Sequence, residues 1–291
     1  MINPELLEEL VSFKKYGTLS ATAEHLLITQ PSVTRGMKKL EQELGVTLFN
    51  RSANKIELTA TGNLAAQEAE KLLKSQEVFI EKVINFDKSQ QSIKLGSVAP
   101  GPLLFIQSEY DQNKFEQKLT FNHQLVTPED VTSDLLTYKE QIVFSHQEIQ
   151  TKEIESLYLG SEQLSVRIDK FNPLSQQKSV SFADLAGVSF LVAQDIGPWK
   201  NICETYIPKA KFLYQDDLNS LDELTRYSNF PVFRSNLTRL DQNRNENDNR
   251  KEVQISDEHN FLPIYASYLK YKENKARIKP FLQKLIKIWP K

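Results

Sequence analysis

The sequence has few of the residues that build disulfides, metal sites or membrane spans. It contains one cysteine, Cys203, in 291 residues, which excludes an internal disulfide and any zinc site made of cysteines. No run of about 18 apolar residues is present, so we predict no membrane-spanning helix and no membrane partner. The N-terminal segment lacks the basic, apolar and small-residue order of a secretory signal. These absences predict a cytoplasmic protein.

Motifs that carry catalysis are also missing. The chain has no G-x-S-x-G sequence, no glycine-rich phosphate loop and no H-E-x-x-H sequence. Its 4 histidines are scattered, so no pair has the spacing of metal ligands. We therefore predict that the protein is not an enzyme and that it uses no metal and no cofactor.

Neither sign of charge dominates the whole chain, but one segment is basic. The formal net charge is -2, from 36 basic and 38 acidic residues. Residues 1–28 carry a net charge of -2, whereas residues 29–55 carry +3. A local basic patch of this kind is enough for binding to nucleic-acid phosphates, because each contact releases counterions from the nucleic acid whatever the total charge of the protein. Residues 29–55 are therefore the first candidate for nucleic-acid contact.

The spacing of apolar residues predicts three helices, over residues 4–16, 18–27 and 31–44. Gly17 and Gly45 suit the ends of the first and third helices, and Thr29 suits the cap of the third. A turn of three to four residues joins the second helix to the third, whose outer face is basic. This order predicts a helix-turn-helix, and the alternating segment 47–61 predicts a hairpin, or wing.

A long helix is predicted over residues 62–88, which contain no proline and no internal glycine. Apolar residues recur along it at alternating steps of four and three, which is a heptad pattern. The stripe includes Leu72, Gln76, Phe79 and Val83. Such a stripe can join two chains as a coiled coil or pack on the protein's own core. We expect dimerisation, with Gln76 fixing the register between two chains.

From residue 93 the pattern changes to strands that alternate with helices. The first strands are predicted at residues 92–98, 117–125 and 141–145. This order predicts an open, mostly parallel α/β domain, which binds ligands at the carboxyl ends of its strands. The polar segment 241–252 is predicted to be an exposed loop, and a strand over 262–271 and a helix over 277–289 close the chain.

One long motif carries a family resemblance. The stretch "SATAEHLLITQPSVTRGMKKLEQELGVTLFNR" is followed by "IELTATG" and by the long helix. It contains an alanine-rich helix, a Ser/Thr-Gln-Pro turn, a Ser/Thr-Arg pair and a Leu-Gly-x-x-Leu-Phe-x-Arg sequence. This pattern resembles the DNA-binding region of the LysR-type transcriptional regulators. The later "NPLSQQKSVSFADLAGVSFLV" resembles their effector domain more loosely, with Asn172 where the family usually has histidine.

The resemblance implies an α/β protein with an N-terminal all-α winged helix-turn-helix, a long linker helix and a two-subdomain α/β effector domain like that of periplasmic binding proteins. We place these parts at residues 1–61, 62–90 and 91–291. Within the last part, subdomain I covers about 91–160 and 266–291, and subdomain II about 161–265. The sequence departs from the family pattern at two places. Gly36 lies inside the third helix. In the effector domain "LTRYSNFPVF" stands in place of a glycine-rich stretch, so the ligand cleft is expected to differ in shape.

The predicted DNA contacts lie in the third helix, in the turn before it and in the wing. They are Thr29, Gln30, Pro31, Ser32, Thr34, Arg35, Lys38, Lys39, Arg51 and Lys55. The Gln30 amide can bond an adenine edge in the major groove, Pro31 can touch a thymine methyl group, and Arg35 can neutralise a phosphate. Arg51 is expected to hold the wing to the DNA backbone or to enter the minor groove. Structural roles stay open for Thr29, as a helix cap, and for Pro31, as a helix starter.

For the α/β part, the resemblance implies a cleft that binds a small effector. The candidate effector residues lie near predicted strand ends and are Ser97, Pro100, Gly101, Thr127, His146 and Gln194. A helix that starts near Pro100 offers free backbone donors, which favours an anionic or zwitterionic effector. Ser97 and Thr127 can instead be helix caps, and His146 an exposed loop residue.

The expected partners are double-stranded DNA with an inverted-repeat operator, a small-molecule effector, and further copies of the chain in a homodimer or homotetramer. Two other functions stay open. The α/β part alone suits a small-solute-binding protein without a DNA role, and an enzyme is the remaining alternative. Retention on DNA or heparin at low salt separates the regulator from the solute-binding protein.

Overall fold

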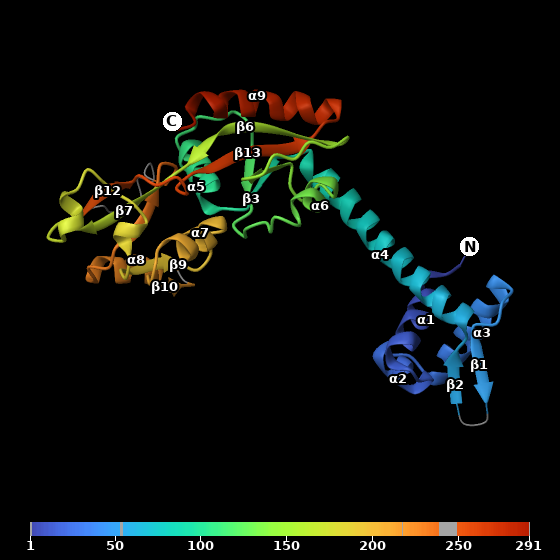
Figure 1. The fold of residues 1–291 in the computed structure, drawn as a ribbon. Helices are drawn as coiled ribbons and strands as arrows, with labels where there is room; N and C mark the ends of the chain where they lie inside the picture. The colour runs from blue at the N-terminus through green and yellow to red at the C-terminus, as the bar shows by residue number, and fades with distance from the viewer. Residues whose placement is uncertain (1, 53–54, 217, 239–248, 291) are drawn as a thin grey trace. The chain divides into compact units, whose positions relative to one another are not determined.

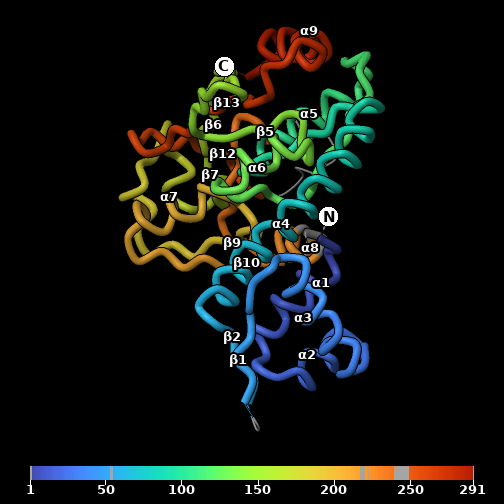
Figure 2. The backbone as a smooth tube through the Cα atoms, turned by 90° about the vertical axis from the view of Figure 1, so that its right-hand side faces the viewer, coloured from blue at the N-terminus to red at the C-terminus, as the bar shows by residue number. Residues whose placement is uncertain are grey.

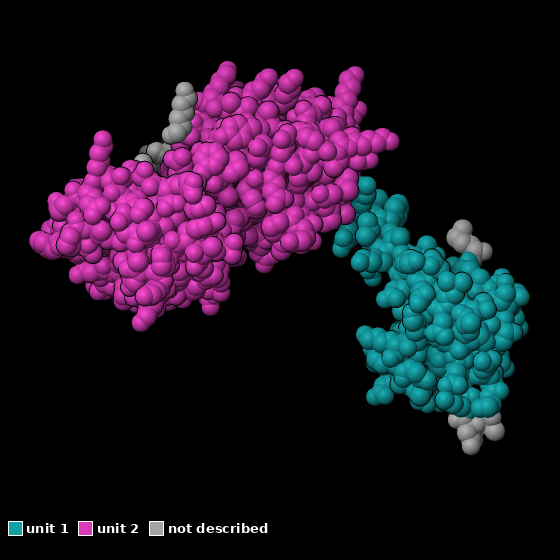
Figure 3. Space-filling model, viewed as in Figure 1, with its two compact units in different colours: residues 1–84 teal, residues 85–291 magenta. Residues whose placement is uncertain are grey.

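The computed structural model describes residues 2–52, 55–216, 218–238 and 249–290. The chain forms two compact units, residues 1–84 and residues 85–291, which are teal and magenta in Figure 3. The boundary falls inside the helix that was predicted over residues 62–88. Among the helices of these described ranges, none combines the length and the apolar character that crossing a membrane requires.

Unit 1 is a winged helix-turn-helix followed by a long helix (Figure 1). Its elements, in chain order, are α1 (Pro4–Tyr16), α2 (Leu19–His25), α3 (Gln30–Leu44), β1 (Phe49–Ser52), β2 (Lys55–Leu58) and α4 (Ala60–Ser89), which continues into unit 2. Strands β1 and β2 pair antiparallel and form the wing. The three predicted helices, the hairpin and the long helix are therefore confirmed.

Caps explain where these helices begin and end. The side chains of Asn3, Thr18 and Thr29 accept hydrogen bonds from backbone N–H groups at the starts of α1, α2 and α3. Gly17 and Gly45 end α1 and α3 with φ angles of 77° and 67°, which a residue with a Cβ adopts only at a cost. The predicted caps at Thr29, Gly17 and Gly45 are thus confirmed.

The second helix is shorter than the prediction, which extended it to Leu27. It ends at His25, and Leu27 has a left-handed backbone with a φ angle of 56°, which interrupts the helix. Backbone bonds close this turn, because the Leu27 N–H donates to Glu24 over 3.2 Å and the Ile28 N–H donates to Ala23 over 3.0 Å. The Leu27 side chain is 92% exposed, so packing does not hold it.

The core of unit 1 orients α3. Val33, Met37 and Leu40 recur at steps of four and three and are fully buried against Leu10 of α1. The apolar face of α3 is therefore turned inward. The basic residues Arg35, Lys38 and Lys39 are exposed on the outer face.

Unit 2 is an α/β fold. Its strands are β3 (Ile93–Ser97), β4 (Leu119–Phe121), β5 (Ile142–Ser145), β6 (Ile154–Glu162), β7 (Leu164–Asp169), β8 (Ser179–Val180), β9 (Ser189–Ala193), β10 (Lys211–Gln215), β11 (Val232–Ser235), β12 (Arg250–Ile255) and β13 (Leu262–Leu269). Its helices are α5 (Pro100–Asp111), α6 (Val131–Leu136), α7 (Pro198–Tyr206), α8 (Leu218–Tyr227) and α9 (Lys272–Ile288), with short 3-10 turns at Pro173–Gln176 and Ala183–Leu185.

The strands of unit 2 form two larger sheets and one pair. The first sheet has the order β4-β3-β5-β13-β6, the second has the order β11-β7-β12-β8, and β9 pairs with β10. The prediction of a mostly parallel sheet is wrong for part of both larger sheets. In the second sheet, β7 pairs antiparallel with β11 and with β12, and only β12 and β8 pair parallel. Strand β3 pairs parallel with β4 and β5, but β13 pairs antiparallel with β5 and with β6, beside which it lies in Figures 1 and 2.

Three predicted boundaries in unit 2 move. Strand β4 keeps only Leu119–Phe121 of the predicted 117–125, and α6 begins at Val131 although a start near Pro128 was expected. The predicted loop 241–252 is wrong for its last residues, because β12 begins at Arg250, whose guanidinium donates to backbone carbonyl groups. The rest of that prediction, residues 241–248, lies outside the described residues.

Candidate nucleic-acid interface

The first turn of α3 presents polar side chains to solvent. Gln30 is the first residue of α3 and is exposed. The Thr29 Oγ1 accepts a bond from the Ser32 N–H over 3.3 Å and lies 2.9 Å from the Ser32 hydroxyl oxygen. Pro31 is in the first turn, where a missing N–H costs nothing. The structural roles left open for Thr29 and Pro31 are therefore present, and their DNA contacts stay a prediction.

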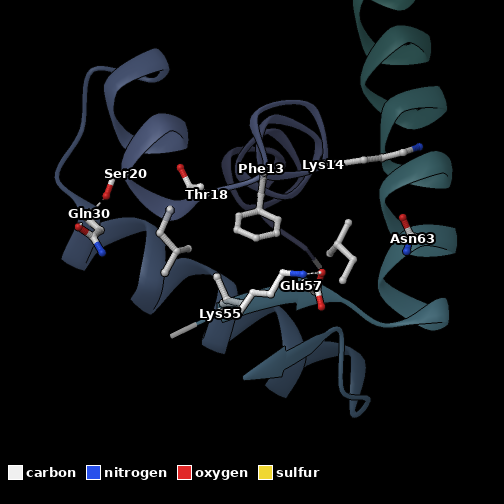
Figure 4. Close-up of a pocket in the computed structure, with 12 residues that line it drawn as sticks. Phe13, Lys14, Thr18, Ser20, Gln30, Lys55, Glu57 and Asn63 are labelled. Atoms are coloured by element: carbon white, nitrogen blue, oxygen red, sulfur yellow. Dashed lines mark hydrogen bonds and ion pairs between the residues drawn. The ribbon is translucent and has the colours of Figure 1, made fainter. Parts of the chain in front are cut away.

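The Gln30 side chain is bonded to the preceding helix. The Ser20 hydroxyl of α2 donates to the Gln30 Oε1 over 3.1 Å (Figure 4). The Gln30 backbone carbonyl accepts a bond from the Thr34 hydroxyl over 3.0 Å. The hydroxyl proton of Thr34 is thus used inside the helix, and its oxygen remains an acceptor.

Three basic side chains extend from the outer face of α3. Arg35, Lys38 and Lys39 are all exposed. The Arg35 Nη2 donates to the Ser32 hydroxyl oxygen over 3.3 Å, which holds the guanidinium beside the first turn. Lys39 is 3.9 Å from Glu43 with a side chain that is 61% exposed, so this ion pair is weak. The outer face of α3 is therefore positive.

Glu41 connects α3 to the wing. Its Oε1 accepts bonds from the N–H groups of Leu48 and Phe49 over 2.8 and 3.1 Å, and its Oε2 lies 3.2 Å from the Arg51 Nη2. These contacts fix the first wing strand relative to the helix. The sequence analysis did not assign a role to Glu41, although this residue lies inside the long stretch that carries the family resemblance.

A hollow of about 630 Å³ lies between the corner joining α1 to α2, the start of α3 and strand β2 (Figure 4). It is lined by the polar groups of Ser20 and Gln30 and by the cations of Lys14 and Lys55. The Lys55 Nζ is 2.5 Å from Glu57, but the Lys55 side chain is 68% exposed. Hydrogen-bonding and cationic groups thus share one concave surface next to α3.

A buried carboxyl group lies beneath the outer face of α3. Glu9 of α1 is 9% exposed, and within the described residues its Oε2 has no hydrogen-bond partner. Burial, with a smaller contribution from the charge of Glu5, raises the pKa of Glu9 from 4.5 to about 7. A Cβ at Gly36 would lie 1.9 Å from that Oε2. The unexpected Gly36 of α3 therefore leaves the space that the Glu9 carboxyl occupies.

The apolar stripe of α4 is exposed. The side chains of Leu72, Phe79 and Val83 are 58%, 65% and 54% exposed, and Gln76 is exposed between them. Only the N-terminal part of the stripe enters the core of unit 1, at Ala69. The predicted dimerisation residues thus lie on one accessible helix.

Two of the predicted effector residues are bonded to their own chain. The Ser97 side chain is fully buried, and its hydroxyl donates to the Phe144 carbonyl over 3.3 Å and accepts from the Ala99 N–H over 3.2 Å. The Thr127 hydroxyl donates to the Asp130 carboxylate over 2.7 Å and accepts the Asp130 N–H over 3.3 Å. Both hydroxyls are used inside the turns that precede α5 and α6, but neither residue is the helix cap, which is Ala99 for α5 and Asp130 for α6. The Ser97 side chain has no exposed surface.

Two other predicted effector residues differ in how far their polar groups are exposed. His146 follows β5 and is half-buried, and its Nδ1 is a buried atom that has no hydrogen-bond partner in the described ranges. Burial lowers the pKa of His146, which favours the neutral ring. Gln194 follows β9 with an exposed side chain, and its N–H donates to the Gln215 carbonyl over 2.9 Å.

The start of α5 is covered by a glutamate that the sequence analysis missed. Glu162, at the end of β6, is 2% exposed, and its Oε2 accepts a bond from the Trp199 Nε1 over 3.0 Å. The Ser235 hydroxyl also bonds this carboxyl, and burial raises the pKa of Glu162 above its usual range. A Cβ at Gly101, next to Pro100 in the first turn of α5, would lie 2.1 Å from the Glu162 Oε1.

The N-terminus of α7 also meets this part of α5. Gly197 precedes α7 with a φ angle of 59°, and a Cβ there would lie 2.2 Å from the Val98 carbonyl oxygen. Trp199 in the same helix reaches Glu162. Segments far apart in the sequence therefore close around one helix start. Among the residues with described positions, no group of three or more His, Cys, Asp or Glu side chains could hold a metal ion.

The N-terminal motif can be compared with known families. The model described as "Bacterial regulatory helix-turn-helix protein, lysR family" matches residues 4–63, which span α1 to β2 and the start of α4. Residues 4–63 thus match the LysR-type helix-turn-helix domain. All ten predicted DNA-contact residues lie inside the matched segment.

Individual relatives show how far the similarity extends. ClcR of Pseudomonas putida, an HTH-type transcriptional regulator, is 39% identical to this protein over 72 residues, which are 25% of this chain and 24% of ClcR. YybE of Bacillus subtilis (strain 168), an uncharacterized HTH-type transcriptional regulator, is 26% identical over 196 residues, 65% of each chain. The matches therefore cover between a quarter and two thirds of these relatives.

The fold extends beyond the matched sequence. The structure of DarR from Vibrio fischeri, solved in complex with DNA, has a TM-score of 0.57 and 18% identity, and the match covers 98% of this chain and 99% of that chain. At this identity the likeness shows the fold alone. The winged helix, the long helix and the α/β unit thus follow one another as they do in that structure.

Proposed function

We propose that this protein is a LysR-type, sequence-specific DNA-binding transcriptional regulator whose α/β unit binds a small effector. The observation that carries the proposal is the orientation of α3, whose apolar residues are buried while Gln30, Arg35 and Lys38 are exposed together. A helix presented in this way fits the major groove of DNA. The relatives are named as transcriptional regulators, which favours this function over an enzyme or a solute-binding protein. Such a regulator acts on bacterial DNA in the cytoplasm.

Each predicted contact has a role in the proposed complex. Gln30 and Pro31 meet base edges, and Arg35 neutralises a phosphate. The remaining contacts to phosphate, sugar or the minor groove come from Thr29, Ser32, Thr34, Lys38, Lys39, Arg51 and Lys55. The wing residues keep a fixed position because Glu41 holds the wing strand to α3.

We further propose that the exposed stripe of α4 joins two copies of the chain. Leu72, Phe79 and Val83 are each more than half exposed, and burying them in a coiled coil removes their apolar surface from water. A symmetric dimer presents two α3 helices to the half-sites of an inverted repeat. A homotetramer is then a pair of such dimers.

The assembly has a direct test. Leu72→Asp with Phe79→Asp places two charges in the stripe and should yield monomers, measured by light scattering. Loss of the second binding module should weaken binding to an inverted-repeat duplex about 100-fold or more. Lys74→Asp, on the same helix but outside the stripe, is the matched control. A double variant that keeps the wild-type mass would show that α4 does not join two chains.

The proposed effector is anionic or zwitterionic and binds near the start of α5. The exposed side chains of Thr127 and Gln194 and the half-buried ring of His146 provide polar groups, while Ser97 shapes the backbone from inside. Burial raises the pKa of Glu162, which favours its neutral form and reduces repulsion of an anion near α5.

A thermal-shift screen of metabolites tests the effector proposal without knowledge of the operator. A ligand that binds only the folded chain adds about 2.7 kcal/mol at a hundredfold excess over its Kd. His146→Ala and Gln194→Ala should reduce the shift caused by a confirmed metabolite, whereas Lys178→Ala, an exposed residue elsewhere in unit 2, should not. If the metabolite shifts the melting temperature of all three variants equally, the effector does not bind at these strand ends.

DNA binding is tested with the full-length protein on a duplex selected from a randomised library and on a scrambled duplex. Arg35→Ala should weaken both and lower the salt slope by about one, because a phosphate contact is lost. Gln30→Ala should cost roughly 1 to 3 kcal/mol on the selected duplex and leave the scrambled one nearly unchanged. A chain that retains no duplex at low salt would support the solute-binding alternative.

A further inference from the structure

Two side chains of the helix-turn-helix meet although they are ten positions apart in the sequence. The Ser20 hydroxyl donates to the Oε1 of Gln30 over 3.1 Å, and Figure 4 shows both residues on the same side of the hollow. Both side chains are exposed, so burial does not impose the contact. The bond therefore selects one orientation of an amide that would otherwise rotate freely in solvent.

The orientation determines which group faces the DNA. An amide carries an acceptor at Oε1 and two donors at Nε2. Since Ser20 holds the Oε1 of Gln30, the Nε2 is the end left to face a base. In the major groove, guanine, adenine and thymine each present an acceptor, whereas cytosine presents only its amino donor. A donor-first amide therefore distinguishes cytosine from the other bases on the contacted strand.

We propose that Ser20 is a specificity-determining residue, which positions the Gln30 amide with its Nε2 toward the DNA so that a base with a major-groove acceptor is selected and cytosine is rejected. This inference rests on the proposed DNA-binding function and adds a residue outside the set predicted from the sequence.

The backbone on both sides of the contact is fixed, as a positioning role requires. On α2, the Thr18 side chain caps the helix, and Thr22 is fully buried with its hydroxyl bonded to the Thr18 carbonyl over 2.7 Å. On α3, the Gln30 carbonyl accepts the Thr34 hydroxyl. The Gln30 side chain is thus the adjustable part, and Ser20 is the group that restrains it.

The experiment uses the full-length protein and a library of randomised duplexes whose bound fraction is sequenced. The wild type should exclude cytosine at one position of each half-site. Ser20→Ala should admit cytosine there and weaken binding to the wild-type consensus duplex about two- to tenfold, since an unrestrained side chain must be ordered on binding. Ser20→Thr keeps the hydroxyl and should restore the exclusion. Ser75→Ala, which removes an exposed hydroxyl of α4, is the control for hydroxyl loss.

A double-mutant cycle separates positioning from direct contact. If Ser20 acts through Gln30, Ser20→Ala should have no further effect once Gln30→Ala is present. The inference is overturned if Ser20→Ala still excludes cytosine, or if its effect persists unchanged in the Gln30→Ala background, which would mean that Ser20 contacts DNA itself. If the duplexes bound by Gln30→Ala have the same sequences as those bound by the wild type, Gln30 does not read a base. That result would contradict the proposed function, whereas the two preceding results contradict only the role of Ser20.

Discussion

Each unit of the protein contains a buried glutamate that lies against a glycine, and the two pairs differ in how the acid is held. In unit 2, Glu162 is 2% exposed and bonded to Trp199 and Ser235 while it contacts Gly101. In unit 1, Glu9 is 9% exposed, and among the described residues its Oε2 has no partner. In unit 2 the glycine therefore lies beside a carboxyl that is fixed by hydrogen bonds. In unit 1 it lies beside a carboxyl whose Oε2 has no hydrogen-bond partner among the described residues.

The difference shows that burial alone does not define what an acid does. A buried carboxyl with donors on two elements fixes those elements together, because any movement leaves polar groups unsatisfied. A buried carboxyl without donors gains by moving to solvent or by remaining protonated. We therefore expect Glu162 to resist perturbation and Glu9 to respond to pH and to its neighbours.

The largest expected effect is on the fixed pair. Gly101→Ala places a Cβ about where the Glu162 Oε1 lies, and Glu162 cannot move away because two bonds hold it. We expect a loss of roughly 1 to 3 kcal/mol in the free energy of unfolding of unit 2. Urea unfolding followed by tryptophan fluorescence reports this unit alone, since both tryptophans, Trp199 and Trp289, lie in it.

The same substitution in a Glu162→Ala background is the control for this prediction. Once the carboxyl is gone, Gly101→Ala should cost much less than in the wild type, and the difference measures the coupling of the pair. An unchanged cost would assign the effect to other neighbours of α5.

The next effect sharpens the comparison through pH. The pKa of Glu9 is about 7 in the folded chain and 4.5 without burial, so only the folded chain keeps the proton between these values. The stability of unit 1 should therefore fall as the pH rises from about 5 to about 7 and level off above about 8, a total of roughly 1 to 3 kcal/mol. Glu9→Gln should remove this slope.

Hydrogen exchange of α1 and α3 amides in the full chain, between pH 5 and pH 8, measures the stability of this unit. Glu8→Gln removes an exposed neighbouring carboxylate and is the matched control. A slope that survives Glu9→Gln but not Glu8→Gln would show that the wrong acid has been assigned.

The smallest effect is expected at Gly36. Gly36→Ala pushes the Glu9 carboxyl toward solvent, and this end of the side chain can move because its Oε2 accepts no hydrogen bond from the described part of the chain. A gain of about 1 kcal/mol in helix propensity should offset much of the steric cost, while the pH slope disappears. If Gly36→Ala instead destabilises unit 1 as much as Gly101→Ala destabilises unit 2, the two pairs are equally fixed and the comparison fails.

The sequence predicted unit 1 well because its signals are local. Caps such as Thr29 and Gly45 and the apolar spacing of α3 lie within one helix, so its bounds and its outward face followed directly. The bonds from Ser20 to Gln30 and from Glu41 to the wing did not follow, because they depend on how α2 and the hairpin turn back onto α3. A contact between elements requires their relative orientation, which periodicity does not contain.

Unit 2 was predicted as a fold class but not as a site. Strands β6 and β7 follow each other closely in the sequence, so no turn signal separates them clearly. The antiparallel pairing of β13 with β6 cannot be predicted from the alternation of strands and helices. Glu162, Trp199 and Ser235 come from separate elements, so no short motif joins them. The predicted Ser97 lies where a strand ends, but its side chain faces inward, a direction that the sequence alone did not specify.

The contact between Gly101 and Glu162 also determines the order in which an engineer can change this junction. A β-carbon at position 101 would lie 2.1 Å from the Glu162 Oε1, so a larger residue there conflicts with this glutamate in its present position. Removal of the acid first therefore opens the space that a larger residue at 101 needs, whereas the opposite order passes through a clash.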